Sequence, residues 1–184
     1  MPVEQAFIAT RNMLERHCMR SFVGGVGAKD DVEAYYRIFD TLLADVMPKV
    51  YFNFKQHAIS PAHYLPEWIV PIFLEHLPFE TCCRIWDVLI LEGDAFLFRT
   101  AIAILGVMEA RLFFPDRREL MEVLHGENKA ALEVARRSSL TGVDFGARYE
   151  QYGLTEESLW DRLESTEWKE STWGRLIQRE LPDV

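Results

Sequence analysis

The chain has few cysteines and no sign of a disulfide framework. Its 184 residues include three cysteines, an odd number, and two of them, Cys82 and Cys83, are adjacent within an apolar pattern of helical spacing. Secreted domains held by disulfides usually carry an even number of cysteines. The start of the chain, MPVEQAF, lacks a basic stretch followed by an apolar run and is therefore not a signal peptide. We expect a cytoplasmic protein.

Basic residues are also scarce. Lysine and arginine number 20, against 29 aspartates and glutamates, which gives a formal charge of -9. No basic cluster is longer than the pairs Arg117-Arg118 and Arg136-Arg137. Nucleic acids and anionic membrane surfaces are bound through many cationic contacts. Neither is expected as a partner of this chain.

A long uncharged apolar run is missing as well. The one candidate for a membrane span, residues 95–114, contains Arg99, Glu109 and Arg111. Each charge near the centre of a bilayer costs about 2.5 to 3.5 kcal/mol on insertion scales. We therefore predict no transmembrane segment, and we interpret this stretch as a helix buried inside the protein.

No segment shows the sustained alternation of polar and apolar residues that is typical of β-strands. Apolar residues instead recur at helical spacing. We expect a helix that starts at Asp30, with Glu33 three residues later, and ends before Pro48. Its apolar face is formed by Val32, Tyr35, Tyr36, Phe39, Leu42, Leu43 and Val46. The pattern predicts an all-α fold, a multi-helix bundle.

Further helices are expected around this one. An apolar stripe over residues 3–22 predicts a single first helix, which ends at the glycine-rich loop GGVGAKD, residues 24–30. Ser60 and Pro61 form a plausible cap and first residue of another helix, whose apolar face continues over residues 68–77. The glycine-rich loop lacks the spacing of a phosphate-binding loop and follows a helix, so we interpret it as a mobile connector.

The densest apolar stretch, CCRIWDVLILEGDAFLFRTAIAIL, joins two helices. Pro78 predicts the start of a helix over residues 79–91, Gly93 can take a left-handed conformation at its end, and Asp94 can cap the next helix. That helix, residues 95–112, is apolar nearly all round except for a narrow stripe through Arg99, Gly106 and Glu109. A helix of this composition is typically surrounded by other helices. We expect it to be the central helix of the bundle.

The order of several short segments identifies a family. MPVEQAFIATRNML, then SPAHYLPEWIVPIF, the RIWD tetrapeptide and EGDAFLFRTAIAIL follow one another over about residues 1–125. This succession resembles the C-terminal half of the TBC domain of Rab GTPase-activating proteins. The residues that match the family motifs, which we expect to be structural, are Arg84, Trp86, Asp87, Gly93 and Phe98.

The resemblance implies a helical domain that acts in vesicle trafficking on a Rab-type small GTPase, with the chain held on endomembranes through that partner. Family members supply an arginine finger in an I-x-x-D-x-x-R motif and a glutamine in a Y-x-Q-G-M motif. Both motifs lie upstream of the segment that MPVEQAF resembles. The resemblance therefore implies that an N-terminal half is missing, that this chain contains no assignable catalytic residue, and that it is inactive alone.

Other functions are left open. A finger-less TBC-like binding or adaptor module would contact a GTPase without activating it. An unrelated helical scaffold would not bind a GTPase at all. The truncated activator predicts an exposed apolar surface where the missing half packs, whereas the finger-less module predicts a closed fold.

Several residue groups resemble sites but are interpreted as structural. Tyr149-Glu150-Gln151 matches Y-x-Q, yet Tyr152 follows instead of glycine and the match lies downstream of RIWD. Ser60 has no nucleophile-elbow context, so a capping role is the better assignment. No metal or cofactor is expected, because the chain lacks C-x-x-C and H-x-x-x-H patterns among the residues His57, His63, His76, Cys82 and Cys83.

Within RIWD, two residues have different explanations. Trp86 shares a helix face with Cys82 and is explained by packing. Asp87 lies past the middle of its helix, where the helix dipole disfavours a carboxylate, so we expect a compensating partner. The candidates are Arg84, three residues earlier, and the N-terminus of a neighbouring helix. A direct contact with the GTPase is the alternative.

The character of the chain changes after Leu124. We divide it into a TBC-like subdomain over residues 1–125 and a second part over residues 126–184. The second part is expected to contain a polar helix over residues 125–139, a linker rich in small residues over 138–146, and a tryptophan-containing helical tail that starts with a Thr155 cap. The aromatic face of this tail is expected to dock onto the bundle, with docking onto a partner as the alternative.

Overall fold

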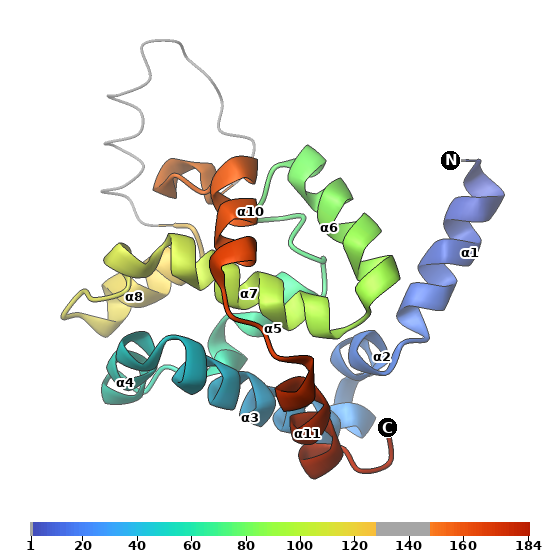
Figure 1. The fold of residues 1–184 in the computed structure, drawn as a ribbon, viewed down its shortest axis with the longest axis horizontal. Coiled ribbons are helices and arrows are strands. Elements are labelled where there is room, and N and C mark those ends of the chain that lie inside the picture. Colours follow the sequence, from blue (N-terminus) through green and yellow to red (C-terminus); the bar gives the residue numbers. More distant parts are fainter. Residues whose placement is uncertain (1, 128–147) are drawn as a thin grey trace, which may run out of the picture.

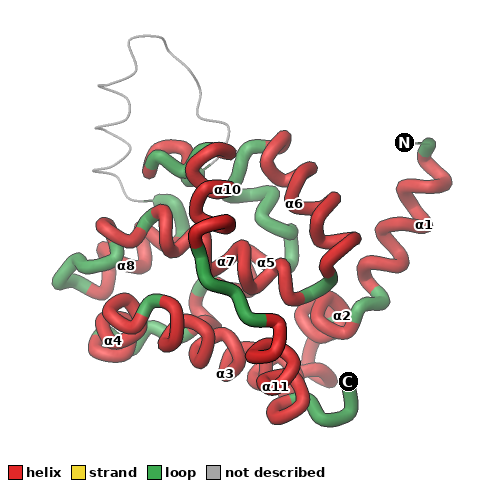
Figure 2. The backbone as a smooth tube through the Cα atoms, viewed as in Figure 1, coloured by secondary structure: helices red, strands yellow, loops and turns green. Residues whose placement is uncertain are grey.

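The computed structural model describes residues 2–127 and 148–184. Within these ranges the chain forms helices and connecting turns and contains no strand, which confirms the predicted all-α fold (Figure 2). The α-helices are α1 (Val3–Leu14), α2 (His17–Val23), α3 (Lys29–Val46), α4 (Pro48–Gln56), α5 (Leu65–Ile69), α6 (Phe79–Glu92), α7 (Ala95–Val107), α8 (Arg117–Leu124), α10 (Glu156–Ser165) and α11 (Glu170–Glu180).

Helix α7 is the central helix, as predicted. Ten of its 13 residues are buried, and Figure 1 shows it in the middle of the other helices. The fully buried Phe98 packs its ring nearly parallel to that of Tyr35 on α3, with 5.5 Å between ring centroids. The helix ends earlier than residue 112, because Met108 is followed by a short 3-10 turn, η3 (Glu109–Arg111).

The single helix predicted over residues 3–22 is wrong, because the chain bends between α1 and α2. Arg16 has an extended backbone, with φ -61° and ψ 142°. Its guanidinium lies 3.3 Å from Asp94 and 3.4 Å from the carbonyl oxygen of Ile90. Contacts with residues far away in the sequence thus stabilise a bend that local periodicity does not predict.

The segment after α2 also differs from the prediction. The glycine-rich stretch expected to be a mobile connector forms a compact 3-10 turn, η1 (Gly25–Ala28). Helix α3 begins at Lys29, with Ala28 in the cap position, so Asp30 lies in the first turn and is not the cap. The end of α3 at Val46, before Pro48, is as predicted.

The helix expected to run through residues 68–77 stops at Ile69. Ser60 and Pro61 begin only the short 3-10 turn η2 (Pro61–His63), after which α5 starts at Leu65. Pro71 has no backbone N–H to continue α5. Ile72 and Phe73 then take positive φ values of 47° and 65°, a conformation stabilised by the hydrogen bond from Phe73 N to Trp68 O, 2.7 Å.

The turn between α6 and α7 was partly predicted. Gly93 has a positive φ of 85°, but its ψ of -168° lies outside the left-handed helical region that was expected. Asp94 occupies the cap position of α7, yet its side chain does not cap that helix. One of its carboxylate oxygens instead accepts a hydrogen bond from the backbone N–H of Cys18, 3.4 Å away, in the first turn of α2.

The tryptophan-containing tail docks onto the bundle, as expected. Helix α10 packs on α7 and α11 packs on α3. Trp160 stacks on Phe96 with 6.2 Å between centroids, and Trp173 lies 5.0 Å from Phe98. Thr155 caps α10 by accepting a hydrogen bond from Ser158 N, 3.2 Å.

The tail residues Leu159, Leu163, Leu176 and Leu181 are buried in the same hydrophobic core as α3 and α7. The division of the chain at residue 125 stays a prediction. The polar helix expected over 125–139 and the linker over 138–146 lie, apart from residues 125–127, outside the described residues.

Candidate interaction surface

Helix α1 presents an uncovered apolar face. None of its residues is buried; Val3 is 85% exposed and Phe7 70% exposed, and Ile8 and Leu14 are also exposed. Figure 1 shows α1 projecting from the edge of the molecule. Val3, Phe7 and Leu14 recur at helical spacing and share one face of the helix. Proteins rarely leave such a stripe in contact with water unless it binds something.

Helix α6 has a second uncovered apolar face. Its inner side, with Cys82, Ile85 and Leu89, is buried against the core. Its outer side exposes Phe79, Ile90 and Leu91, and Leu91 is 84% exposed. Asp87 also lies on this outer side and is exposed, three and four residues before Ile90 and Leu91. The outer side of α6 therefore combines apolar side chains with one central carboxylate.

Arg16 connects the two uncovered helices. It follows the C-terminal end of α1, and its Nη2 donates to the carbonyl oxygen of Ile90, in the last turn of α6. The C-terminal ends of α1 and α6 are thereby held together at one edge of the molecule (Figure 1). We call the uncovered residues of the two helices the α1–α6 surface; its members are Val3, Phe7, Leu14, Phe79, Asp87, Ile90 and Leu91.

The partner expected for Asp87 is not Arg84. Arg84 pairs with Glu156, at the start of α10, and its guanidinium lies 4.6 Å above the ring of Trp160. Among the described residues, no ion pair or hydrogen bond involves the Asp87 side chain. The expectation of a compensating partner within this chain is thus wrong for the part that the structure describes.

The other family-motif residues lie within the fold. Trp86 is half-buried and donates from Nε1 to the carbonyl oxygen of Ile72, 3.1 Å, which holds the turn after α5 against α6. Gly93 supplies the positive φ between α6 and α7. Phe98 lies in the core between Tyr35 and Trp173. Trp86 and Arg84 thus hold α6 against neighbouring segments, whereas Asp87 is exposed.

The Y-x-Q match is buried. Tyr149 accepts a hydrogen bond from Trp68 Nε1, 2.8 Å, and donates to the carbonyl oxygen of Leu124. Gln151 is 9% exposed and donates from Nε2 to the carbonyl oxygen of Gly126, 2.8 Å. A glutamine that orients a water on another protein must reach that protein's surface. Gln151 instead fastens the tail to the end of α8.

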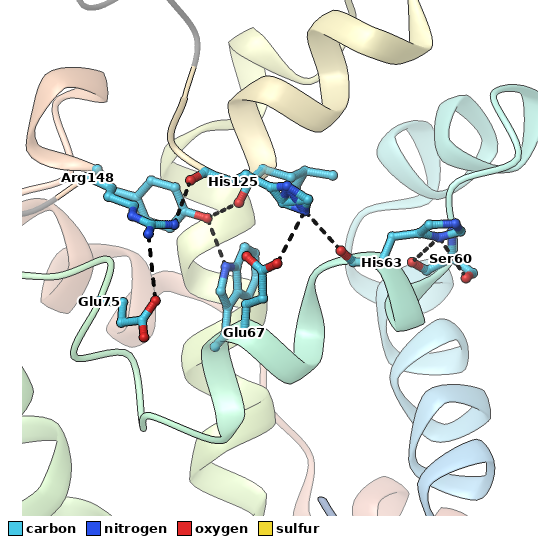
Figure 3. Close-up of polar contacts among 9 residues, drawn as sticks. Ser60, His63, Glu67, Glu75, His125 and Arg148 are labelled. Carbon is cyan, nitrogen blue, oxygen red and sulfur yellow. Dashed lines mark hydrogen bonds and ion pairs between the residues drawn. The ribbon is translucent and has the colours of Figure 1, made fainter. Parts of the chain in front are cut away.

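Figure 3 shows a cluster of polar side chains around His125 and Arg148. His125 contacts the carbonyl oxygen of His63 at 3.0 Å and the carboxylate of Glu67 at 3.8 Å. Arg148 donates to the carbonyl oxygen of His125, 3.3 Å, and pairs with Glu75, 3.7 Å. These contacts connect α8, the segment before α10 and the α5 region, so the cluster has a structural explanation.

Ser60 and His63 lie in contact but do not form a catalytic pair. Ser60 Oγ is 3.0 Å from His63 Nδ1, which also accepts from the backbone N–H of Ser60, 3.0 Å. The other ring nitrogen of His63 is 3.3 Å from the guanidinium of Arg117. A general base needs a carboxylate at that position to stabilise its imidazolium form. The pair caps the 3-10 turn η2; the capping role predicted for Ser60 is thus confirmed, but on this short turn and not on the longer helix that was expected.

Among the described residues, no group of three or more histidine, cysteine, aspartate or glutamate side chains is arranged to hold a metal ion. His76 is fully buried, and neither ring nitrogen has a hydrogen-bond partner. Burial, together with the positive charges of Arg148 and His125, lowers the pKa of His76 to about 4.

In the described part of the chain, no helix is long and apolar enough to cross a membrane.

The sequence predicted that the tail docks onto the bundle, but not that α10 packs on the polar stripe of the central helix. Arg99 donates to the carbonyl oxygen of Leu163, 3.0 Å, and Arg162 pairs with Glu109, 3.6 Å. A side chain at Gly106 would bring its Cβ to 2.2 Å from Arg162 Nε. Helix α10 therefore packs on the narrow polar stripe of α7. The signal in the sequence is a glycine between two charged residues on an otherwise apolar helix.

The described residues form a helical domain with a packed hydrophobic core and an uncovered apolar surface at one edge. The family model described as the Rab-GTPase-TBC domain matches residues 1–113. The chain therefore belongs to the Rab-GTPase-TBC domain family. This confirms the resemblance drawn from the sequence.

Individual relatives agree with the family. TBC1 domain family member 12 of Xenopus tropicalis is 35% identical over 111 residues, which cover 60% of this chain and 16% of the relative. TBC1 domain family member 14 of Homo sapiens is 36% identical over 104 residues, covering 56% of this chain and 15% of the relative. Drainin of Dictyostelium discoideum is 24% identical over 174 residues, 95% of this chain and 34% of the relative. The chain matches only a minor part of the length of each.

Proposed function

We propose that this chain is the C-terminal portion of a Rab-type GTPase-activating domain. In this proposal it supplies the scaffold and part of the GTPase-binding surface, while the arginine and glutamine fingers come from an N-terminal half that packs against it. The partner is a Rab-type small GTPase, and the complex acts on the cytoplasmic side of endomembranes. The observation that supports this proposal best is the uncovered apolar face of α1.

The face of α1 supports a missing half for an energetic reason. Burying a large apolar side chain stabilises a protein by about 1.5 to 3 kcal/mol, and α1 gains little of this within the described fold, because none of its residues is fully buried and Met13 is only partly buried against the core. Isolated helices of about 12 residues are marginal in water, so a helix of this length needs tertiary packing. A neighbouring structural element that covers α1 would supply that packing.

The residues that could imitate the fingers are engaged within the fold. Gln151 is held by backbone carbonyls, Arg84 by Glu156, and Arg99 by the carbonyl oxygen of Leu163. A finger must instead project free of its own domain to reach the charge that develops on the transferred phosphoryl group. In the proposal, this chain alone therefore does not accelerate GTP hydrolysis.

The alternative is a finger-less TBC-like module that binds a GTPase or an adaptor without activating it. A module of this kind is expected to have a closed surface, with its apolar side chains covered. The uncovered α1–α6 surface argues against it.

A fusion protein tests the proposal. The segment of human TBC1 domain family member 14 that precedes its matched region, chosen to include an I-x-x-D-x-x-R and a Y-x-Q-G-M motif, is joined to the N-terminus of this chain. We expect the fusion to accelerate single-turnover GTP hydrolysis by at least one Rab by about a thousandfold, the contribution of an arginine finger. The control is the same fusion with the motif arginine changed to alanine. A well-folded fusion that accelerates hydrolysis by no Rab, while the chain binds none, would refute the proposal.

A further inference from the structure

The outer side of α6 carries an unusual combination of groups. Asp87 is an exposed carboxylate with exposed apolar neighbours, Ile90 and Leu91, in the next turn of the same helix. The nearest arginine of the helix, Arg84, is paired with Glu156 and stacked on Trp160. Within the described residues, Asp87 is thus left without a counter-charge.

The position of Asp87 makes this electrostatically unfavourable. It lies in the C-terminal half of α6, where the negative end of the helix dipole disfavours a carboxylate. Water solvates the charge as long as the surface is open. If another element covers Ile90 and Leu91, Asp87 loses that water, and a covered charge must be paired and hydrogen-bonded.

We propose that the outer side of α6 is covered by a helix from the N-terminal half of the same polypeptide, and that this helix presents an arginine or lysine to Asp87. This inference rests on the proposed function. It adds that the missing N-terminal half packs against α6 as well as against α1. It also specifies the chemistry of the covering helix, an apolar face with one cation at the position that meets Asp87.

The exposed side chains of α6 favour a permanent interface with the N-terminal half over a transient contact with a GTPase. Interfaces that are always buried are more apolar than transient ones, which resemble the rest of the protein surface. Phe79, Ile90 and Leu91 each expose more than half of their surface, and α1 beside them has no buried residue. A GTPase that dissociates in every cycle would leave this surface in water for much of the time.

A second copy of the chain is a poor occupant for reasons of charge. The chain has a formal charge of -9. A two-fold contact centred on α6 would place Asp87 against the same helix of the other copy, where Arg84 is already paired with Glu156. On α1, Arg11 is likewise paired, with Glu15. Two copies would therefore bury Asp87 without a free cation from α6 or from Arg11.

The test measures access to α6. Leu91→Cys is made in a Cys83→Ser background, in the chain and in the fusion with the segment of human TBC1 domain family member 14, and both proteins are labelled with a maleimide probe. We expect the introduced thiol to react at least about tenfold more slowly in the fusion, because labelling then requires local opening.

In the fusion, Asp87→Asn is expected to restore labelling by about tenfold, because removing one partner of a covered ion pair weakens the contact. Asp161→Asn, an exposed carboxylate on α10, is the matched control and is expected to change the rate less than about twofold.

Other outcomes would overturn the proposal. Equal labelling in the chain and a folded fusion would leave α6 uncovered, even if the fusion accelerates GTP hydrolysis and so upholds the proposed function. Protection that appears only after a Rab is added would assign the surface to the GTPase. Protection of the chain alone, with a doubled mass in solution, would assign it to a second copy.

A further measurement needs no fusion. If the outer side of α6 has no partner in the isolated chain, we expect Leu91→Asp and Asp87→Asn to leave its thermal unfolding midpoint unchanged. A marked fall for either variant would show that these side chains already have partners within this chain, and would refute the inference.

Discussion

Arg16 and Asp94 form an ion pair, 3.3 Å from Nη1 to Oδ1, that joins the bend after α1 to the start of α7. The second carboxylate oxygen of Asp94 accepts from the backbone N–H of Cys18 and so caps α2. One half-buried carboxylate thus fixes the bend from which α1 projects and the turn that follows α6. The orientation of both uncovered helices depends on this contact.

Asp94→Ala is therefore expected to destabilise the chain by about 1 to 3 kcal/mol, through the loss of a helix cap and of a charged hydrogen bond. Urea unfolding followed by circular dichroism measures the change. Asp161→Ala is the control, because Asp161 is exposed on α10 and is expected to change stability by less than about 0.5 kcal/mol. If the two variants unfold alike, Asp94 does not organise the bend.

The central helix gives a second prediction. Leu105 is fully buried in α7, so Leu105→Ala is expected to cost about 2 to 5 kcal/mol, from lost burial and the cavity left behind. Leu91→Ala, the same change at an exposed site, is the control. A loss below about 0.5 kcal/mol at Leu105 in denaturant titration would contradict the central position of α7.

The sequence predicted these core elements because each follows from a local pattern. The apolar face of α3 recurs at helical spacing, and α7 is apolar nearly all round, so both helices are evident without any tertiary information. The stop at Pro48 and the cap at Thr155 are likewise properties of neighbouring residues.

The errors arose where distant residues decide the conformation. The bend at Arg16 depends on Asp94, 78 positions away. The positive φ of Phe73 accompanies the complete burial of its ring, which no periodicity shows. For the candidate surface, the sequence identified Asp87 as needing a partner and offered Arg84 or the N-terminus of a neighbouring helix. Only the folded structure shows that Arg84 pairs with Glu156 on α10 instead.

His76 predicts a pH dependence of stability. Its pKa is lowered to about 4 in the folded chain, mainly by burial, whereas an unfolded histidine titrates near 6.5. Between these values the unfolded state binds more protons than the folded state. Stability therefore falls as the pH drops from about 6.5 to about 4, by up to about 3 kcal/mol from this group, and is unaffected by it above about 7.5.

The contribution of His76 is isolated by comparing the chain with His76→Phe. We expect the difference in unfolding free energy between the two proteins to shift in favour of the variant as the pH is lowered through this window. Parallel stability curves from about pH 7.5 to about pH 4 would show that His76 is not held neutral in the fold.

The surface of α1 predicts a context-dependent effect. Because Phe7 is 70% exposed, Phe7→Ala is expected to change the stability of the isolated chain by less than about 0.5 kcal/mol. In the fusion with the preceding segment of human TBC1 domain family member 14, the same change is expected to cost about 3 kcal/mol or more, as for a buried phenylalanine. An equally small effect in both proteins would mean that the missing N-terminal half does not pack against α1.

The most direct test of the proposed function is the effect of the chain itself on GTP hydrolysis. Single-turnover phosphate release is measured across a panel of GTP-loaded Rab proteins, with the chain in excess and with Gln151→Ala in parallel. We predict no acceleration by either protein, because both finger motifs are absent from this chain and Gln151 is buried against Gly126. Acceleration that Gln151→Ala abolishes would contradict this prediction by making the Y-x-Q match a working finger. Acceleration that survives the change would contradict it as well, by assigning the finger to an arginine such as Arg84 or Arg99 that we have described as structural.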